Sequence, residues 1–364
     1  YCEMESFIYN DYSKIKSLNC KDGNTGISFK IKARNYVSAA GPWVDTLRTK
    51  DQSMNNKYLH LTKGVHIVFP YEKLPVKQPL YFDVHDERMI FAIPRGRTTY
   101  VGTTDTNYSG NLERVVATKE DAKYLLNAIN STFPQVNLNI DDIESNWAGL
   151  RPLIHEEDKD PSELSRKDEL FISESGLISI AGGKLTGYRR MAQRVMEAVL
   201  KTMKNKHKEH LNKSSTEIIP LVSPPLENSH AVNVYQNELE ATLLSKGISE
   251  SYHAWYLCST YGKKAEIIIE KSNQFDNKDA LEKLIRAELW FCIHYEMTNS
   301  LTDFFVRRTG RLYFDIPSVK KYLKIISKDC ANYLNWDAER LASEEKNLNL
   351  LIQDATTYYN TEFI

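Results

Sequence analysis

A lysine that follows two glycines at the end of an apolar segment is the first candidate for chemistry. In "ISIAGGKLTGYRR", residues 178–190, we expect a strand to run into Gly182 and Gly183, with Lys184 opening a helix. The free N–H groups and the positive dipole end of a helix start attract an anion, and Lys184 adds a full charge. A Walker A loop is excluded, because positions 178 and 185 hold isoleucine and leucine where it needs glycine and serine or threonine. By itself, the segment fits an ordinary turn with a surface lysine equally well.

Two arginines can join this lysine in one anion site. Arg151 lies in "WAGLRPL", just after an apolar stretch, and Arg166 lies in "DPSELSRKDE", at the start of the next expected strand. Both flank one acidic loop and could converge on Lys184. Two guanidinium groups and an ammonium group suit a phosphate dianion better than a carboxylate, which usually needs one arginine fork. Pairing of Arg166 with the neighbouring Asp168 and Glu169 is the alternative.

A histidine in an expected strand is a candidate base. In "KGVHIVF", residues 63–69, strand alternation puts three apolar side chains on one face and leaves His66 beside Gly64 on the other. An imidazole takes up a proton near neutral pH, as a general base must. A core histidine that is satisfied by the backbone is the simpler interpretation of the same pattern.

Two more strand ends carry small and polar residues that suit a flat ligand. Ala40, Gly41 and Trp43 follow the strand in "YVSAAGPWVDTLR", and Thr104 and Asp105 follow the strand in "YVGTTDT". Open α/β sheets bind ligands outside the carboxyl ends of their strands, where small residues allow close approach. Ordinary tight turns would explain both segments as well.

The segments that position these residues combine strands and helices. Strands are expected within residues 26–41, 59–70, 89–106 and 169–183, and a helix capped by a threonine within residues 118–133. After Lys184 the period becomes helical, with an apolar stripe of Met191, Val195, Met196 and Val199. The first half of the chain is therefore mixed α and β.

The second half has a helical period throughout. Helices are expected within residues 234–246, 249–262, 280–308, 318–334 and 336–359, with core aromatic residues Trp255, Tyr256, Trp290, Phe291 and Tyr295. A stretch rich in proline and serine precedes them. We therefore predict a mixed domain of residues 1–205, a linker of residues 206–231 and an all-helical domain of residues 232–364.

Composition limits the classes of partner. The 364 residues include 47 basic and 48 acidic side chains, a net charge of −1, so no global field attracts nucleic acid. Five widely spaced cysteines without a CxxC pair argue against a disulfide framework and fit a reducing cytoplasm. His207 and His210 have no third ligand beside them, so no metal site is expected. No apolar run approaches the ~20 residues of a membrane span, so membrane contact would be peripheral.

The motifs, in this order along the chain, resemble those of one enzyme family. The segments AAGPWVD, LTKGVHIVF, VGTTDT, WAGLRPL, DPSELSRKD and AGGKLTGYRR are similar to the FAD-dependent glycerol-3-phosphate dehydrogenases and the related α-glycerophosphate oxidases. The helical half resembles the C-terminal domain of the same family, in STYGKKAEII, AELWFCIHYEMTNSLTDFFVRRTG and NYLNWDAERLASEE. The resemblance implies an α+β flavoprotein fold of the glycine/D-amino acid oxidase type, here partial, followed by an all-α C-terminal domain.

The resemblance also implies roles for single residues. Arg151, Arg166 and Lys184 match the positions that bind the substrate phosphate in the family. The residues in segments that line FAD are Ala40, Gly41, Trp43, Thr104, Asp105, Gly183, Lys184 and Leu185. His66 matches a histidine of the family motif, and its role as the base is our inference. His66, Lys184 and Arg151 are thus the catalytic candidates.

One family motif does not occur in this sequence. The family begins with a Rossmann unit that carries GxGxxG within ~30 residues, and no such motif is present in the chain, which begins YCEMESFIYND without an initiator methionine. We therefore expect a fragment that lacks the amino-terminal Rossmann region. By itself, such a chain would be an incomplete enzyme.

The resemblance implies oxidation of sn-glycerol 3-phosphate to dihydroxyacetone phosphate, with FAD as cofactor and respiratory quinone as electron acceptor. Three alternatives stay open: an oxidase that uses oxygen and gives hydrogen peroxide, an oxidase of a carboxylate substrate, and a non-catalytic fragment that acts in assembly. The family suggests a homodimer. We expect the protein in the cytoplasm, and a quinone acceptor would require peripheral contact at the cytoplasmic membrane face. Arg307, Arg308 and Arg311 are candidates for that contact, or else they cap helices and pair with acidic neighbours.

Overall fold

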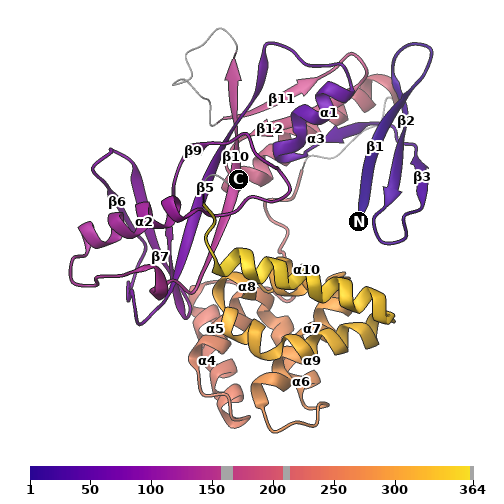
Figure 1. The fold of residues 1–364 in the computed structure, drawn as a ribbon. Coiled ribbons are helices and arrows are strands. Elements are labelled where there is room, and N and C mark those ends of the chain that lie inside the picture. The colour runs from indigo at the N-terminus through magenta and orange to yellow at the C-terminus, as the bar shows by residue number, and fades with distance from the viewer. Residues whose placement is uncertain (157–166, 208–213, 361–364) are drawn as a thin grey trace. The chain divides into compact units, whose positions relative to one another are not determined.

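The computed structural model describes residues 1–156, 167–207 and 214–360 (Figure 1). Its strands are β1 Cys2–Tyr9, β2 Ile15–Asp22, β3 Ser28–Ile31, β4 Tyr36–Ser38, β5 Lys57–Pro70, β6 Leu80–Asp83, β7 Met89–Arg95, β8 Thr98–Gly102, β9 Thr106–Asn107, β10 Ser145–Glu156, β11 Asp168–Ile172 and β12 Leu177–Gly182. Its α-helices are α1 Val44–Lys50, α2 Lys119–Thr132, α3 Tyr188–His207, α4 Ser229–Ser245, α5 Ser251–Tyr261, α6 Ala265–Ser272, α7 Ala280–Tyr295, α8 Arg311–Phe314, α9 Ile316–Leu334 and α10 Ala338–Thr356. Short 3-10 turns are η1 Gly41–Trp43, η2 Ile140–Asp142, η4 Leu185–Gly187 and η5 Gly262–Lys264.

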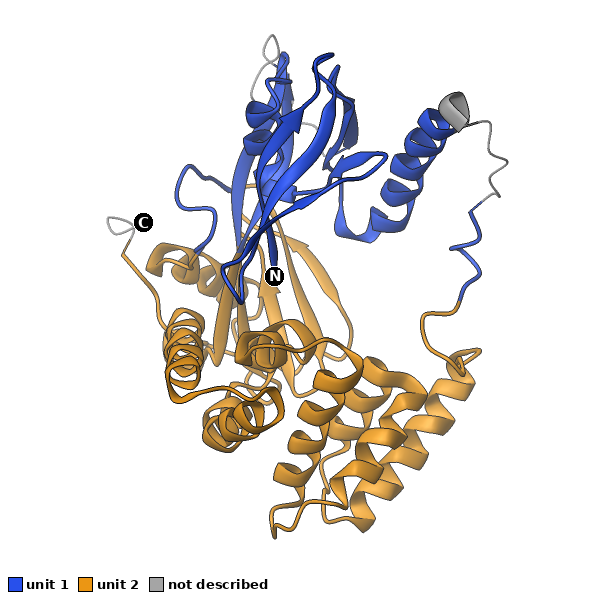
Figure 2. Ribbon diagram, turned by 90° about the vertical axis from the view of Figure 1, so that its right-hand side faces the viewer, with its two compact units in different colours: residues 1–64, 105–115, 149–219 blue, residues 65–104, 116–148, 220–364 orange. Residues whose placement is uncertain are grey.

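Two compact units divide the described chain (Figure 2). The first unit holds residues 1–64, 105–115 and 149–219, and the second holds residues 65–104, 116–148 and 220–364. The chain passes from one unit to the other within strands β5 and β10. The second unit therefore contains sheet strands as well as every helix from α4 onward.

The first unit contains two three-stranded sheets. One has the antiparallel order β1-β2-β3, and the other has the order β11-β12-β4. In the latter, β12 runs parallel to β4, with Leu177 opposite Tyr36. Helix α3 covers this sheet through buried Val195 and Val199. Met196 is 50% exposed, so the expected apolar stripe was wrong at this residue, which lies one position off the buried i, i+4 row.

A larger sheet has the strand order β10-β5-β8-β7-β6, with β9 paired to β5. In the second unit, helix α2 packs on it, because apolar side chains of β5 such as Ile67 and Phe69 meet Leu125 and Ile129 of the helix. Helix α2 begins where the sequence predicts. The Thr118 hydroxyl accepts a bond of 3.1 Å from the backbone N–H of Asp121, a capping interaction that satisfies a free donor.

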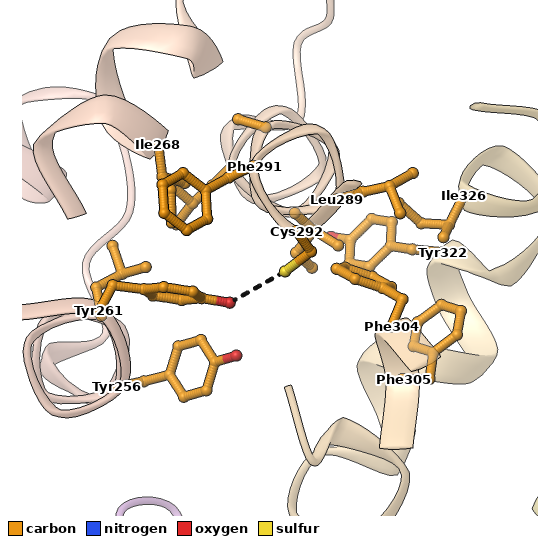
Figure 3. Packing of buried hydrophobic residues seen from close by; sticks show 14 of the residues in the cluster. Tyr256, Tyr261, Ile268, Leu289, Phe291, Cys292, Phe304, Phe305, Tyr322 and Ile326 are labelled. Atoms are coloured by element: carbon orange, nitrogen blue, oxygen red, sulfur yellow. Dashed lines mark hydrogen bonds between the residues drawn. The ribbon is translucent and has the colours of Figure 1, made fainter. Parts of the chain in front are cut away.

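The helices from α4 onward enclose one apolar core. Figure 3 shows its centre, where the Tyr261 hydroxyl and the Cys292 thiol lie 3.5 Å apart beside Phe291. The expected helix over 280–308 was wrong in its extent, because α7 ends at Tyr295, Met297 has a φ of +57°, and a π-helical turn follows. Tyr295 is 55% exposed and is not a core residue, whereas Tyr256 and Phe291 are buried as expected.

A charged cluster lies inside this helical core. Glu288 and Arg311 form an ion pair of 2.7 Å, and Arg311 also pairs with Asp315 at 2.9 Å. The Arg311 side chain is only 2% exposed. Arg311 therefore cannot contribute to a membrane-facing surface, and its pairing with acidic neighbours follows the alternative interpretation. Arg307 pairs likewise with Asp303, at 2.7 Å.

None of the described helices combines the length and apolar character that a membrane crossing requires. All five cysteines are free thiols, and four of them are buried: Cys20, Cys258, Cys292 and Cys330. Packing accounts for these four residues.

Candidate functional site

The carboxyl ends of two parallel strands form one edge of the small sheet in the first unit. Strand β4 leads into the turn at Ala40 and Gly41, and β12 leads into the turn at Gly183 and Lys184. Parallel neighbours end at the same edge of a sheet. The structure therefore brings together residues that lie more than a hundred positions apart in the sequence, and six of the expected FAD-lining residues belong to these two turns: Ala40, Gly41, Trp43, Gly183, Lys184 and Leu185.

The turn after β12 depends on its glycines. Gly182 and Gly183 have φ angles of +71° and +78°, and residues with a Cβ atom adopt such angles only with strain. Lys184 then has an extended backbone, and its carbonyl accepts a 2.8 Å bond from the N–H of Gly187 before α3 begins. The Lys184 side chain is exposed and forms no ion pair with any other described residue. Its ammonium group is thus available to an anion.

Large apolar side chains are exposed at the same edge. Trp43 is 41% exposed and Leu185 is 89% exposed. Apolar surface of this kind, beside the small residues Ala40 and Gly41, suits the face of a flat aromatic ligand. These residues could therefore contact the ring system of FAD, as the sequence predicts.

Arg151 of β10 occupies the space above a glycine of β5. A Cβ atom added at Gly64 would lie 2.3 to 2.6 Å from the guanidinium atoms of Arg151, so only glycine leaves room for this group. The guanidinium also donates a long 3.4 Å bond to the carboxylate of Asp105. The side chains of Arg151 and Asp105 are 28% and 33% exposed, so both groups are partly accessible to solvent.

A packing contact links the Arg151 strand to the glycine turn. A Cβ atom at Gly182 would lie 3.0 Å from the Cδ1 atom of Ile154. Ile154 is three residues beyond Arg151 on β10, a separation of about 10 Å along a strand. Residues three apart on a strand point to opposite faces, so this contact places strand β10 beside the glycine turn without placing the Arg151 guanidinium there.

Arg166 lies outside the described residues, but its proposed carboxylate partners do not. Asp168 pairs with Arg194, and Glu169 pairs with Lys57 at 2.6 Å. Both carboxylates therefore have cationic partners other than Arg166.

His66 lies in an aromatic cluster of the second unit. It is opposite Gly102 on the neighbouring strand β8, and a Cβ atom at Gly102 would lie 2.3 Å from the Cδ2 atom of the imidazole. The ring stacks on Trp147, with a centroid distance of 4.7 Å and an interplanar angle of 13°. Tyr100 completes this side of the cluster, and burial raises the pKa of its hydroxyl, which stays neutral.

The two remaining expected FAD-lining residues differ in exposure. Thr104 is 2% exposed, and its hydroxyl accepts a 3.0 Å bond from the backbone N–H of Val65. Its side chain therefore holds the strands together. Asp105 is partly exposed and contacts Arg151, as described above.

Sequence reasoning missed one residue of this cluster, Trp147. It stands in the segment WAGLRPL, but nothing in the local pattern predicts which ring an indole stacks on.

Comparisons with known proteins identify the family of this chain. Residues 7–189 match the family described as FAD dependent oxidoreductase, and residues 225–341 match the C-terminal domain of alpha-glycerophosphate oxidase. The chain is 42% identical over 358 residues to the aerobic glycerol-3-phosphate dehydrogenase of Bacillus subtilis, covering 95% of this chain and 64% of that protein. It is 41% identical to the enzyme of that name from Staphylococcus haemolyticus, covering 98% and 64%. The chain thus spans less than two thirds of the length of these curated relatives.

One solved structure has the same fold over nearly the whole chain. The glycerol-3-phosphate dehydrogenase from Bacillus halodurans, solved in complex with FAD, matches with a TM-score of 0.85 at 38% identity, covering 98% of this chain and 69% of that one. The expected fold, an oxidase-type flavoprotein domain followed by a helical domain, is confirmed. The chain therefore belongs to the family of FAD-dependent oxidoreductases and is a relative of the bacterial glycerol-3-phosphate dehydrogenases.

Proposed function

We propose that the full protein oxidises sn-glycerol 3-phosphate to dihydroxyacetone phosphate with FAD as cofactor. The observation that carries this proposal is the pair of accessible cations, Arg151 above Gly64 and Lys184 on its glycine turn, within one compact unit. The names of the relatives, aerobic glycerol-3-phosphate dehydrogenases, support the same substrate.

We assign the substrate phosphate to Arg151, Lys184 and Arg166. The guanidinium of Arg151 offers donors in a fixed fork, and Lys184 contributes a mobile point charge. Asp105 holds Arg151 by a long bond of 3.4 Å between partly exposed groups. A phosphate that enters the site would compete with this carboxylate for the guanidinium.

The reaction removes one proton and one hydride from the substrate carbinol. FAD, when bound, accepts the hydride from the carbon that carries the secondary hydroxyl. We assign the hydroxyl proton to the imidazole of His66, which leaves the carbonyl of dihydroxyacetone phosphate. Lys184 would also stabilise negative charge that develops on the substrate oxygen, so its substitution should cost more than phosphate positioning alone.

We propose respiratory quinone as the acceptor that reoxidises the flavin. The rival acceptor is oxygen, which would give hydrogen peroxide, and the match of residues 225–341 to the C-terminal domain of alpha-glycerophosphate oxidase supports it. Oxygen uptake and peroxide production, measured against the anaerobic reduction of a soluble quinone, separate the two. A quinone acceptor resides in the membrane, so we propose that the protein works in the cytoplasm in peripheral contact with the membrane. We also propose a homodimer, which a measurement of mass in solution tests.

The phosphate assignment is tested by two substitutions in the full-length, FAD-loaded enzyme. Lys184→Met and Arg151→Met should each raise the KM for glycerol 3-phosphate by roughly 10-fold or more, while the KM for glycerol changes little. Glycerol lacks the phosphate, so its KM does not depend on these cations, whereas Lys184→Met should lower kcat for both substrates because it also removes the charge beside the substrate oxygen. Steady-state kinetics on both substrates provide the measurement.

Two matched controls distinguish the site from a general loss of positive charge. Lys21→Met on β2 and Lys30→Met on β3 remove exposed cations of the same unit from a sheet that contains neither Arg151 nor Lys184. Both should leave the two KM values unchanged. Equal effects of the Lys184 and Arg151 substitutions on glycerol and glycerol 3-phosphate would refute the phosphate assignment, and faster turnover of a hydroxy-carboxylate would favour the carboxylate rival. Full-length enzyme that turns over neither substrate would favour a role in assembly.

A further inference from the structure

Three consecutive residues at the start of β10 contact the helical segment of the second unit. The Ser145 hydroxyl donates to the backbone carbonyl of Tyr313, and the Asn146 amide donates to the carbonyl of Ala355 at 3.0 Å. The third residue, Trp147, packs its indole on Tyr313, at a centroid distance of 5.5 Å. The start of β10 is therefore an anchor for the helices that follow in the sequence.

The same indole of Trp147 joins the helices to the candidate base. Phe314, at the end of α8, meets Trp147 edge-on at 5.4 Å and 68°. Trp147 in turn stacks on the imidazole of His66 at 4.7 Å and 13°. Both geometries lie in the ranges that aromatic pairs prefer. We call His66, Trp147 and Phe314 the aromatic stack.

The outer end of the aromatic stack is itself fixed. The guanidinium of Arg95 lies 4.2 Å from the centroid of the Phe314 ring. Arg97 donates to the Phe314 carbonyl at 3.2 Å, while its guanidinium also makes two bonds, of 2.5 and 2.9 Å, to the carboxylate of Glu144. Side-chain and backbone contacts together hold Phe314 in place.

The inner end of the aromatic stack has little freedom to turn. The imidazole of His66 lies against Gly102 on one side, where a Cβ atom would come within 2.3 Å. The ring of Phe91 lies 5.5 Å from it, in addition to Trp147. If Trp147 lost its position, the imidazole would gain space in which to rotate.

We propose that the helical C-terminal domain positions the imidazole of His66 through the aromatic stack, which makes Trp147 and Phe314 positioning residues. This inference rests on the proposed function, in which His66 accepts the substrate proton. A base must lie within hydrogen-bonding reach of the proton that it removes, and small misplacements cost a large part of the rate. The helical domain would thus contribute to turnover without touching the substrate.

The first experiment separates positioning from packing by kinetics. In the full-length, FAD-loaded enzyme, Trp147→Leu and Phe314→Leu should each lower kcat for glycerol 3-phosphate by roughly 10- to 100-fold. The KM should stay within about twofold, because the phosphate clamp is untouched. Trp147→Phe keeps an aromatic face and should restore most of kcat. Trp290→Leu on α7 is the matched control, since it removes a partly buried tryptophan that lies outside the aromatic stack, and it should leave kcat unchanged.

The second experiment reads the imidazole directly and needs no turnover. In the chain labelled with ¹³C-histidine, the ring resonances of His66, identified by their loss in His66→Asn, should lie upfield because of the Trp147 ring current. Trp147→Leu should move them downfield, and Phe314→Leu should move them in the same direction. His66 resonances that stay unchanged in Phe314→Leu would overturn the proposal.

The two experiments fail in different ways. A His66→Asn enzyme with the parental kcat would refute His66 as the base. The catalytic purpose of the aromatic stack would then fall too, even if the resonances of His66 respond to Trp147→Leu. A low kcat for His66→Asn, together with parental kcat values for Trp147→Leu and Phe314→Leu, would refute the positioning role and leave the proposed function standing.

Discussion

At the scale of single residues, the absence of a side chain at Gly64 decides where a guanidinium group lies. The atoms that a Cβ would meet there belong to the far end of Arg151, and the nearest of them is 2.3 Å away. The end of a long flexible side chain can move, whereas a backbone or a packed ring cannot. An alanine at this position should therefore displace Arg151 without unfolding the strand.

We accordingly predict that Gly64→Ala raises the KM for glycerol 3-phosphate severalfold in the full-length enzyme. The free energy of unfolding should change by no more than about 1 kcal/mol, because alanine in a compatible conformation gains roughly that much from the unfolded state. Steady-state kinetics and denaturant unfolding measure the two quantities.

A second glycine provides the control for this prediction. Gly23→Ala adds a Cβ whose nearest neighbour is 3.4 Å away, an ordinary contact far from Arg151 in the sequence. It should alter neither quantity. A Gly64→Ala enzyme with the parental KM would show that the position of Arg151 does not matter for substrate binding.

At the scale of elements, helix α5 carries a buried histidine that makes its packing sensitive to acid. His253 is 4% exposed, and burial lowers the pKa of its imidazole below the ordinary value of 6.5, with the positive charge of Arg311 acting in the same direction. The folded protein therefore prefers the neutral ring.

The sign of the pH dependence follows from this shift. Below about pH 6.5 the unfolded chain binds a proton at His253 that the folded protein does not, so the free energy of unfolding falls as the pH falls. The stability that the neutral His253 ring contributes is fully present above about pH 6.5. It is fully lost once the pH has fallen below the lowered pKa of His253 in the folded state. We predict that His253→Gln loses less stability than the parent between pH 7.5 and 5.5. Urea unfolding at several pH values measures it, and a constant difference between the two proteins would contradict the prediction.

At the scale of the whole molecule, the residues expected to line FAD are distributed over several turns, which a ligand can order together. Two of these turns, around Gly41 and around Lys184, follow the parallel strands β4 and β12. A ligand that binds only the folded state stabilises it by about 2.7 kcal/mol at a hundred times its Kd. That stabilisation should slow local opening most at the residues that the ligand contacts.

Removal of FAD from the loaded full-length enzyme should therefore increase amide hydrogen exchange in residues 39–43 and 182–188. Helix α7, with its buried apolar side chains, should exchange at the same rate with and without FAD, and it serves as the internal control. Exchange measured by mass spectrometry tests this. If each turn exchanged at the same rate with and without FAD, the two turns would not hold the cofactor.

The sequence by itself determined the local structure and the family. The glycine pair before Lys184 predicted a strand, a turn and a helix, and the threonine at 118 predicted the start of α2, because both signals act within a few residues. The ordered motifs predicted the oxidase-type fold, which the comparisons confirmed. The domain boundaries at 206 and 231 and the roles of the site residues stay predictions.

Only the tertiary structure decided which residues meet. It put Arg151 above Gly64, stacked Trp147 on His66, and buried Arg311 in the helical core, where the sequence allowed an exposed charge. Each of these side chains lies more than twenty positions from its partner, which for Arg311 is Glu288. Helical or strand periodicity reports only which face a residue occupies. Which partner fills the space opposite that face depends on how the elements pack, and that is set by the sum of many weak contacts across the fold.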